Sequence, residues 1–180
     1  MAEAYAPPQR LVLVGFMGAG KTTVGRLLAR ELGFSFLDMD RRVEQRCGKR
    51  IPEIFADEGE EFFREQERQV AEEARLLERC VIAAGGGAFA FEATREALRR
   101  GSVSVWLWAP LPVLMGRVRL DGSRPLAANR ETIARLFAAR EPSYRLADCH
   151  VDATAGPEEV ARRVRLTVFP PSGARETEGR

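Results

Sequence analysis

The residues best suited to chemistry form the run GFMGAGKT at positions 15–22. This run fits the phosphate-loop pattern, in which a glycine and four variable residues precede Gly-Lys-Ser/Thr. Glycines let backbone N–H groups turn toward a phosphate, and the N-terminus of the following helix adds its positive end. Lys21 is long enough to reach the β- and γ-phosphates, and the Thr22 hydroxyl is a natural ligand for Mg²⁺. We therefore expect the phosphates of a nucleotide to be bound by Gly18, Ala19, Gly20, Lys21, Thr22 and Thr23.

The elements around this run give the context that the pattern requires. Residues 10–14 (RLVLV) are a short apolar run of strand type, and residues 24–32 carry apolar side chains at helical spacing. The alternative is an ordinary glycine-rich turn between a strand and a helix. Because every fixed position matches in the right context, we favour the phosphate loop.

Two carboxylates follow the next predicted strand, at residues 34–37. Asp38 and Asp40 stand at i and i+2, at the strand's C-terminal edge, where ligands bind in open α/β sheets. The alternative is a helix cap for the segment that begins at Arg41. We expect the two acids to be functional, with a capping role alone left open for one of them.

A long helix is predicted next, with Arg64 and Glu67 on one side of it at i and i+3. Taken alone, this pair is more typical of a solvated charged face. The helical spacing continues to Leu77, through an apolar stripe formed by Phe63, Val70, Ala74 and Leu77. After a strand at residues 81–84, three glycines at 85–87 allow either close backbone approach to a ligand or a flexible turn.

Composition limits the class of protein. The 180 residues suit one domain, with 45% hydrophobic and 30% charged residues. No apolar run approaches the ~18 residues of a membrane span, and the first eight residues do not resemble a secretory signal, so we expect a cytoplasmic protein. The net charge of +2 argues neither for nor against an acidic partner. Three cysteines without metal-ligand spacing indicate reduced thiols, and for the single histidine, His150, a core or surface role is favoured over catalysis.

Strands and helices alternate along the chain, which predicts an α/β fold with a mostly parallel sheet. Further strands are expected at 103–108 and 149–152, and further helices at 41–47, 94–100, 112–118, 133–139 and 158–168. Residues 119–126 are polar and turn-rich, as in a mobile loop, and residues 1–9 and 170–180 have little to bury. We find no internal repeat and no second domain.

Together these motifs resemble the shikimate kinase family over about residues 11–168. The matching motifs are GFMGAGKT at 15–22, Asp38-x-Asp40, Phe63-Arg64-x-x-Glu67, Gly85-Gly86-Gly87, Arg124-Pro125-Leu126 and Arg140-x-x-x-Tyr144-Arg145. The resemblance implies a five-stranded parallel sheet flanked by helices, a P-loop fold like that of nucleoside monophosphate kinases. It implies one kinase domain over residues 1–169, with a shikimate-binding segment at about 38–67, a lid at about 119–128 and a disordered tail at 170–180.

The resemblance also implies the activity, which is ATP-dependent phosphorylation of the shikimate 3-hydroxyl in the chorismate branch of aromatic amino acid biosynthesis. In that reading Asp40 faces the hydroxyls and takes the proton, and Arg64 and Arg140 hold the carboxylate. The implied substrate-binding residues are Asp40, Arg64, Gly85, Gly86, Gly87 and Arg140. The partners are ATP and shikimate, without nucleic acid or membrane, and the chain is expected to be a monomer.

On the nucleotide side, the resemblance implies that Lys21 and Arg124 offset the charge of the transferring phosphoryl group. Arg117 takes the place of an arginine near adenine, and the loop at 152–157 flanks its other side. The implied cofactor is Mg²⁺, held by Thr22 directly and by Asp38 through water. Three positions depart from the family pattern: Met39 replaces a usual Ser or Thr, Ala84 replaces a small hydroxyl residue, and residues 153–156 lack an arginine.

Two alternatives come from different classes. Another small-molecule kinase of this fold, such as a gluconate kinase, would not need Arg64 and Arg140 together with the triple glycine. A guanine-specific switch would need an Asn-Lys-x-Asp element, but Asn129 is the only asparagine and an arginine follows it. A non-catalytic relative would be expected to lack Lys21 or Asp40.

Overall fold

The computed structural model describes residues 8–118, 126 and 129–170. These residues form one five-stranded sheet in the order β2-β3-β1-β4-β5, with all neighbouring strands parallel. The predicted α/β fold with a parallel sheet is confirmed. The strands are β1 (Arg10–Val14), β2 (Ser35–Asp38), β3 (Cys80–Ala83), β4 (Val103–Trp108) and β5 (Cys149–Asp152).

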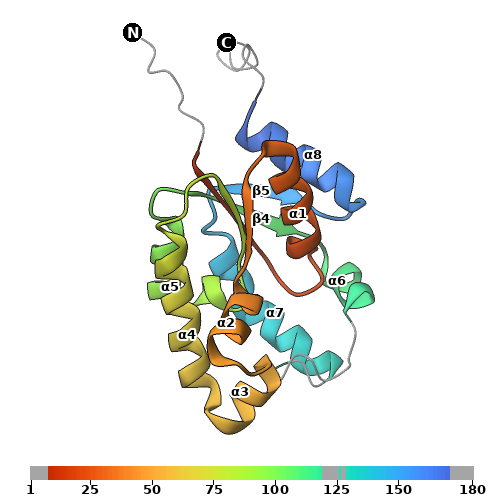
Figure 1. Ribbon diagram of the computed structural model, residues 1–180. Coiled ribbons are helices and arrows are strands. Elements are labelled where there is room, and N and C mark those ends of the chain that lie inside the picture. Colours follow the sequence, from red (N-terminus) through yellow and green to blue (C-terminus); the bar gives the residue numbers. More distant parts are fainter. Residues whose placement is uncertain (1–7, 119–125, 127–128, 171–180) are drawn as a thin grey trace.

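Helices cover both faces of the sheet. On one side α1 packs against α8, and on the other α4 packs against α5 (Figure 1). The helices are α1 (Lys21–Leu32), α2 (Met39–Cys47), α3 (Ile51–Asp57), α4 (Gly59–Ala74), α5 (Glu92–Arg99), α6 (Leu111–Arg117), α7 (Arg130–Tyr144) and α8 (Pro157–Val168), with a short 3₁₀ turn η1 (Ala88–Ala90).

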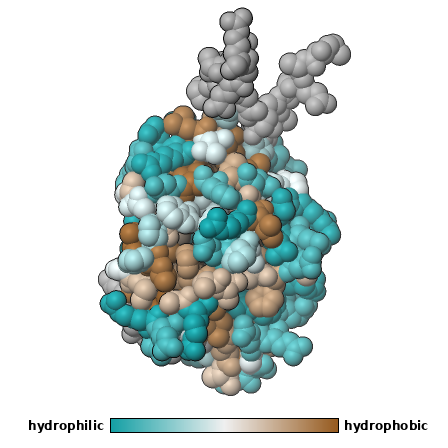
Figure 2. All heavy atoms as spheres, turned by 180° about the vertical axis from the view of Figure 1, so that it is seen from behind, coloured by the Kyte–Doolittle hydropathy of each residue, from teal (hydrophilic) through white to brown (hydrophobic). Residues whose placement is uncertain are grey.

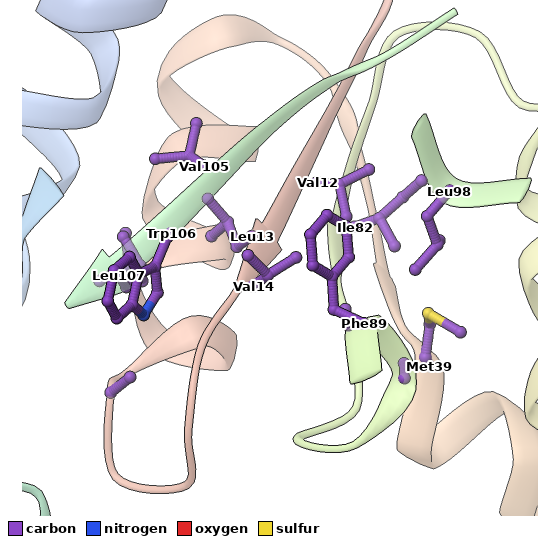
Figure 3. Packing of buried hydrophobic residues seen from close by; sticks show 14 of the residues in the cluster. Val12, Leu13, Val14, Met39, Ile82, Phe89, Leu98, Val105, Trp106 and Leu107 are labelled. Atoms are coloured by element: carbon purple, nitrogen blue, oxygen red, sulfur yellow. The ribbon is translucent and has the colours of Figure 1, made fainter. Parts of the chain in front are cut away.

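The core forms where the central strand is covered on both faces. Strands buried in this way are apolar along their length, and Val12, Leu13 and Val14 of β1 are all fully buried. Figure 3 shows these side chains beside Ile82 of β3 and Trp106 of β4. The remaining surface is mostly polar, with hydrophobic residues in small groups on the face in Figure 2. In the described residues, no helix has the length and apolarity to cross a membrane.

Helix ends follow backbone chemistry that the sequence predicts. The glycines at 33 and 48 take the left-handed conformation, with φ of 64° and 65°, and end α1 and α2. The N-terminus of α2 differs from the prediction, because the helix begins at Met39 and not at Arg41. Asp38 is therefore the N-cap, and Asp40 lies in the first turn of the helix.

The boundaries of α4 and α7 also differ from the prediction. Helix α4 ends at Ala74, and Leu77 lies outside it with 37% of its surface exposed. The chain turns there so that β3 can begin at Cys80, which leaves Leu77 off the buried stripe. Helix α7 begins before the predicted start and continues through Pro142 to Tyr144. A proline is tolerated so close to the end of a helix because the buried Tyr144 holds the last turn in place.

Candidate active site

The backbone of the loop after β1 packs so closely against neighbouring elements that two of its positions leave no space for a side chain. A Cβ atom at Gly15 would lie 2.8 Å from the Leu107 carbonyl oxygen, and one at Gly18 would lie 2.6 Å from that of Leu114. Both have positive φ, 137° and 79°. Helix α1 starts after Gly20 without a side-chain cap, so the N–H groups of its first turn are left for an anion.

Polar side chains converge next to this loop. Lys21 Nζ donates to the carbonyl oxygens of Gly15 and Phe16, at 2.7 and 3.0 Å. Thr22 Oγ1 donates to Asp38 Oδ2 at 2.8 Å, and Asp38 Oδ1 accepts from the backbone N–H of Arg41 at 3.2 Å. Asp38 therefore caps α2 with one oxygen and contacts Thr22 with the other, and its functional role stays a prediction.

Beside the loop lies a cavity of about 340 Å³, and a second cavity of about 340 Å³ adjoins it. Both are lined by Met17, Thr22, Asp38, Asp40 and Gly86. The first is further lined by Lys21, and the second by Arg64, Glu67, Gly87 and Arg140. Residues from the loop, α2, α4 and α7 thus meet in one continuous groove, with Asp40 between its halves.

Two arginines converge at the triple glycine. A Cβ atom at Gly87 would lie 2.7 Å from Arg64 Nη1 and 3.0 Å from Arg140 Nη2. The Arg140 side chain is 8% exposed, and burial lowers its pKa, although it stays charged at neutral pH. The absence of a side chain at Gly87 is what lets two guanidinium groups lie against the backbone and face the same space.

Arg64 is held from two directions. Its guanidinium donates to Glu60 Oε1 from Nε and Nη2, at 3.2 and 2.9 Å, and to Glu67 Oε2 from Nη1 at 2.9 Å. It also lies 4.5 Å from the centre of the Phe91 ring. The alternative of a solvated face is wrong for this pair, because the Glu67 side chain is 1% exposed.

Glu67 has a strongly perturbed carboxyl group. Burial raises its pKa to about 7, the charge of Arg64 opposes that rise, and the charge of Asp40 adds to it. Its Oε1 atom has no hydrogen-bond partner among the described residues. A Cβ atom at Gly85 would lie 2.5 Å from Glu67 Oε1 and 2.6 Å from Asp40 Oδ1.

A third cavity, of about 320 Å³, extends from the phosphate loop along α1. Arg117 borders it and donates from Nη1 to the Ala153 carbonyl oxygen at 2.8 Å and from Nη2 to that of Thr154 at 2.9 Å. The loop after β5 forms another part of the wall. Its residues in the wall are Ala153, Thr154, Ala155, Gly156 and Pro157.

The structure thus brings together every predicted site residue that it describes. Arg124, and the predicted lid at 119–128 except Leu126, lie outside the described residues. The binding roles themselves stay predictions. Two contributors carried no assigned role in the sequence: Phe91, which covers Arg64, and Tyr144, whose hydroxyl donates to the Gly86 carbonyl oxygen. An aromatic residue after the glycines and a tyrosine one helical turn beyond Arg140 were the available signals.

Comparison with known proteins agrees with this geometry. A family model described as shikimate kinase matches residues 17–168. The shikimate kinase of Moorella thermoacetica is 49% identical over 162 residues, covering 88% of this chain and 93% of that protein. That of Cereibacter sphaeroides is 50% identical, covering 86% and 80%. A solved structure of the Acinetobacter baumannii shikimate kinase in complex with shikimate is 36% identical, with a TM-score of 0.86, covering 89% of this chain and 93% of that one.

Proposed function

The chain belongs to the shikimate kinase family, and on that premise we propose which of its residues bind ATP and shikimate and how they act. As a shikimate kinase, it is an ATP-dependent enzyme of the shikimate pathway. It transfers the γ-phosphoryl group of ATP to the 3-hydroxyl of shikimate and releases shikimate 3-phosphate and ADP.

The convergence of Arg64 and Arg140 over Gly87 is the observation that carries the substrate assignment. Planar guanidinium groups bind a carboxylate bidentately, and shikimate carries one carboxylate on its ring. The Acinetobacter relative was solved with shikimate, which supports the same ligand class here. We assign the carboxylate to these two arginines and the ring hydroxyls to Asp40, with Gly85, Gly86 and Gly87 as backbone contacts.

The nucleotide occupies the other half of the groove. We assign its phosphates to residues 18–23 and its adenine to the cavity that Arg117 and the loop at 153–157 line. Thr22 Oγ1 and Asp38 Oδ2, 2.8 Å apart, are the hard oxygen donors that Mg²⁺ prefers. Among the described residues no group of three or more His, Cys, Asp or Glu side chains could hold a metal. This fits an ion bound mainly through ATP oxygens and water, which would neutralise phosphate charge.

Asp40 stands where the two halves meet and is our candidate proton acceptor. As the 3-hydroxyl oxygen bonds to the γ-phosphorus, the bond from that phosphorus to the β,γ-bridging oxygen breaks and ADP leaves with the electron pair. The hydroxyl proton passes to the Asp40 carboxylate. Lys21 offsets the charge on the phosphates, and we assign Arg124, outside the described residues, the same role.

The same proposal covers the organisation of the chain. Residues 1–169 would form one kinase domain, with the shikimate segment at 38–67 and a lid at 119–128. A cytoplasmic monomer is the proposed state. The exposed large hydrophobic side chains of the described residues support it, because they are scattered over several elements: Phe62, Leu76, Leu77, Phe91, Leu146 and Leu166.

A coupled ADP-release assay tests the substrate assignment. Shikimate, quinate and gluconate are compared at equal concentration with Mg²⁺ and ATP. We expect ADP release to depend on shikimate and to be clearly faster than with quinate or gluconate. The other two acids share the carboxylate but lack the ring and hydroxyl pattern of shikimate. Equal rates with gluconate would contradict the assignment.

A further inference from the structure

Glu67 has two oxygen atoms in very different surroundings. Oε2 accepts from Arg64 Nη1 at 2.9 Å, whereas Oε1 accepts from no described residue although the side chain is 1% exposed. Buried polar atoms are almost always hydrogen-bonded, so Oε1 calls for a partner that the described residues do not supply. The positioning of Arg64 explains one oxygen and leaves the other without a role.

The unpartnered oxygen and an oxygen of a second carboxylate both lie close to Gly85. Glu67 Oε1 and Asp40 Oδ1 lie within 2.5 and 2.6 Å of the position that a Cβ atom at Gly85 would take. The glycine leaves this small space open, and both oxygens border it. Two ionised carboxylates would only accept hydrogen bonds and would repel each other, whereas a proton on one of them removes that repulsion.

The charged groups around Glu67 offset one another before substrate binds. On α4 itself Arg64 and Glu60 form an ion pair beside Glu67, α2 contributes Asp40, and α7 contributes Arg140 and the buried Tyr144. The η1 turn contributes no titratable side chain. A carboxylate that binds Arg64 and Arg140 adds a negative charge to this balance, a few ångströms from a carboxyl group that is already buried.

We propose that Glu67 takes up a proton when the carboxylate of shikimate binds, and that its protonated Oε1 then donates a hydrogen bond across Gly85 to Asp40 Oδ1. The proton comes from solvent and returns when the ligand leaves. In this proposal Asp40 stays ionised and takes the 3-hydroxyl proton during the reaction. Glu67 is thus a positioning residue for both Arg64 and Asp40. This inference rests on the proposed carboxylate site.

The direction of the pH effect follows from linkage. Because burial raises the pKa of Glu67 to about 7, the free protein loses this proton as pH rises through neutrality. Added negative charge raises the pKa further in the complex, which keeps the proton to higher pH. Between these two values binding takes up a proton. The Kd for shikimate then rises with pH, by up to about tenfold per unit.

Calorimetric titration of the full chain with shikimate tests the proposal, in two buffers of different ionisation enthalpy at pH 7.5. For the wild type, we expect a binding enthalpy that depends on the buffer and corresponds to roughly half a proton or more. In Glu67→Gln the amide resembles the protonated acid, since it accepts from Arg64 and donates to Asp40. We expect buffer-independent enthalpy, and shikimate binding at pH 8 at least as tight as in the wild type.

Glu60→Gln is the matched control. Glu60 lies on the same helix and also binds Arg64, but its side chain is 47% exposed, so proton uptake should persist. Wild-type uptake in Glu67→Gln, or weaker shikimate binding than wild type at every pH, would overturn the proposal. If Glu67→Gln does not fold, Asp40→Asn replaces it, because its amide can donate to ionised Glu67 and should abolish uptake; unchanged uptake there is contrary evidence. Absence of any binding by the wild type would instead contradict the carboxylate site itself.

Discussion

The nucleotide half and the shikimate half of the groove are built in different ways. The nucleotide half uses the backbone of consecutive residues at 15–22, whose glycines make room for phosphates. The shikimate half uses charged side chains from α2, α4 and α7, which are held by one another and largely buried. A backbone site tolerates changes in nearby side chains, whereas a side-chain site depends on each partner. The largest mutational effects on substrate selectivity are therefore expected in the shikimate half.

The largest effect is expected where the halves meet. Asp40→Asn should leave the fold and ATP binding intact but lower kcat by ~10²–10⁴-fold, because it removes the proton acceptor. The measurement is steady-state turnover with both substrates saturating, with nucleotide binding as the control. Near-normal turnover would remove Asp40 from the mechanism.

Arg64→Lys separates the two halves directly. Lysine keeps the charge but loses the planar fork and the contacts to Glu60 and Glu67. Hydrogen bonds to charged groups contribute ~1.5–3 kcal/mol, so the KM for shikimate should rise roughly tenfold or more while that for ATP changes little. An equal rise in both KM values, or wild-type affinity for shikimate, would show that the guanidinium is not a carboxylate clamp.

Gly87→Ala tests how closely the clamp lies against the backbone. The new methyl group would stand 2.7 Å from Arg64 Nη1, so both guanidinium groups must move, and we expect the KM for shikimate to rise several-fold. Gly86→Ala is the comparison, since its nearest neighbours lie at 3.9 Å and a smaller rise is expected. Equal effects of the two substitutions would argue against contact between the clamp and the glycine backbone.

Tyr144→Phe should have the smallest effect. It removes the hydrogen bond from the tyrosine hydroxyl to the Gly86 carbonyl oxygen, which costs about 1 kcal/mol in the free energy of unfolding. Chemical denaturation checks this value, and the KM for shikimate should change by less than in Gly87→Ala. A rise in the KM for shikimate as large as that of Gly87→Ala would give Tyr144 a direct part in substrate binding.

Local features of the fold were predictable from sequence because their causes are local. The apolar run of β1, the phosphate loop and the glycines that end α1 and α2 each depend on a few consecutive residues. The helix boundaries that depend on tertiary contacts could not be predicted from the sequence. The stripe on α4 suggested a helix to Leu77, and the helix predicted at 133–139 starts earlier and continues to Tyr144 in the structure.

In the site, too, local features were predictable and features that depend on tertiary contacts were not. The spacing of Arg64 and Glu67 predicted that they share a helix face, which the structure confirms. The approach of Arg64 to Arg140 joins residues 76 positions apart, and the family resemblance, not their spacing, suggested it. No sequence signal indicated the unpartnered oxygen of Glu67, because burial of that atom depends on α2, α4 and the glycines packing together.

Asp38 divides its two oxygens between the halves, since Oδ2 accepts from Thr22 and Oδ1 caps the helix that carries Asp40. If a metal-bound nucleotide engages the Thr22 hydroxyl, as proposed, the hydrogen bond from Thr22 to Asp38 Oδ2 would change, and the cap of α2 made by Oδ1 of the same carboxylate could change with it. The two substrates are therefore expected to bind synergistically. By thermodynamic reciprocity, each substrate should increase the affinity for the other by the same factor, and Asp38 is the residue that connects the two sites.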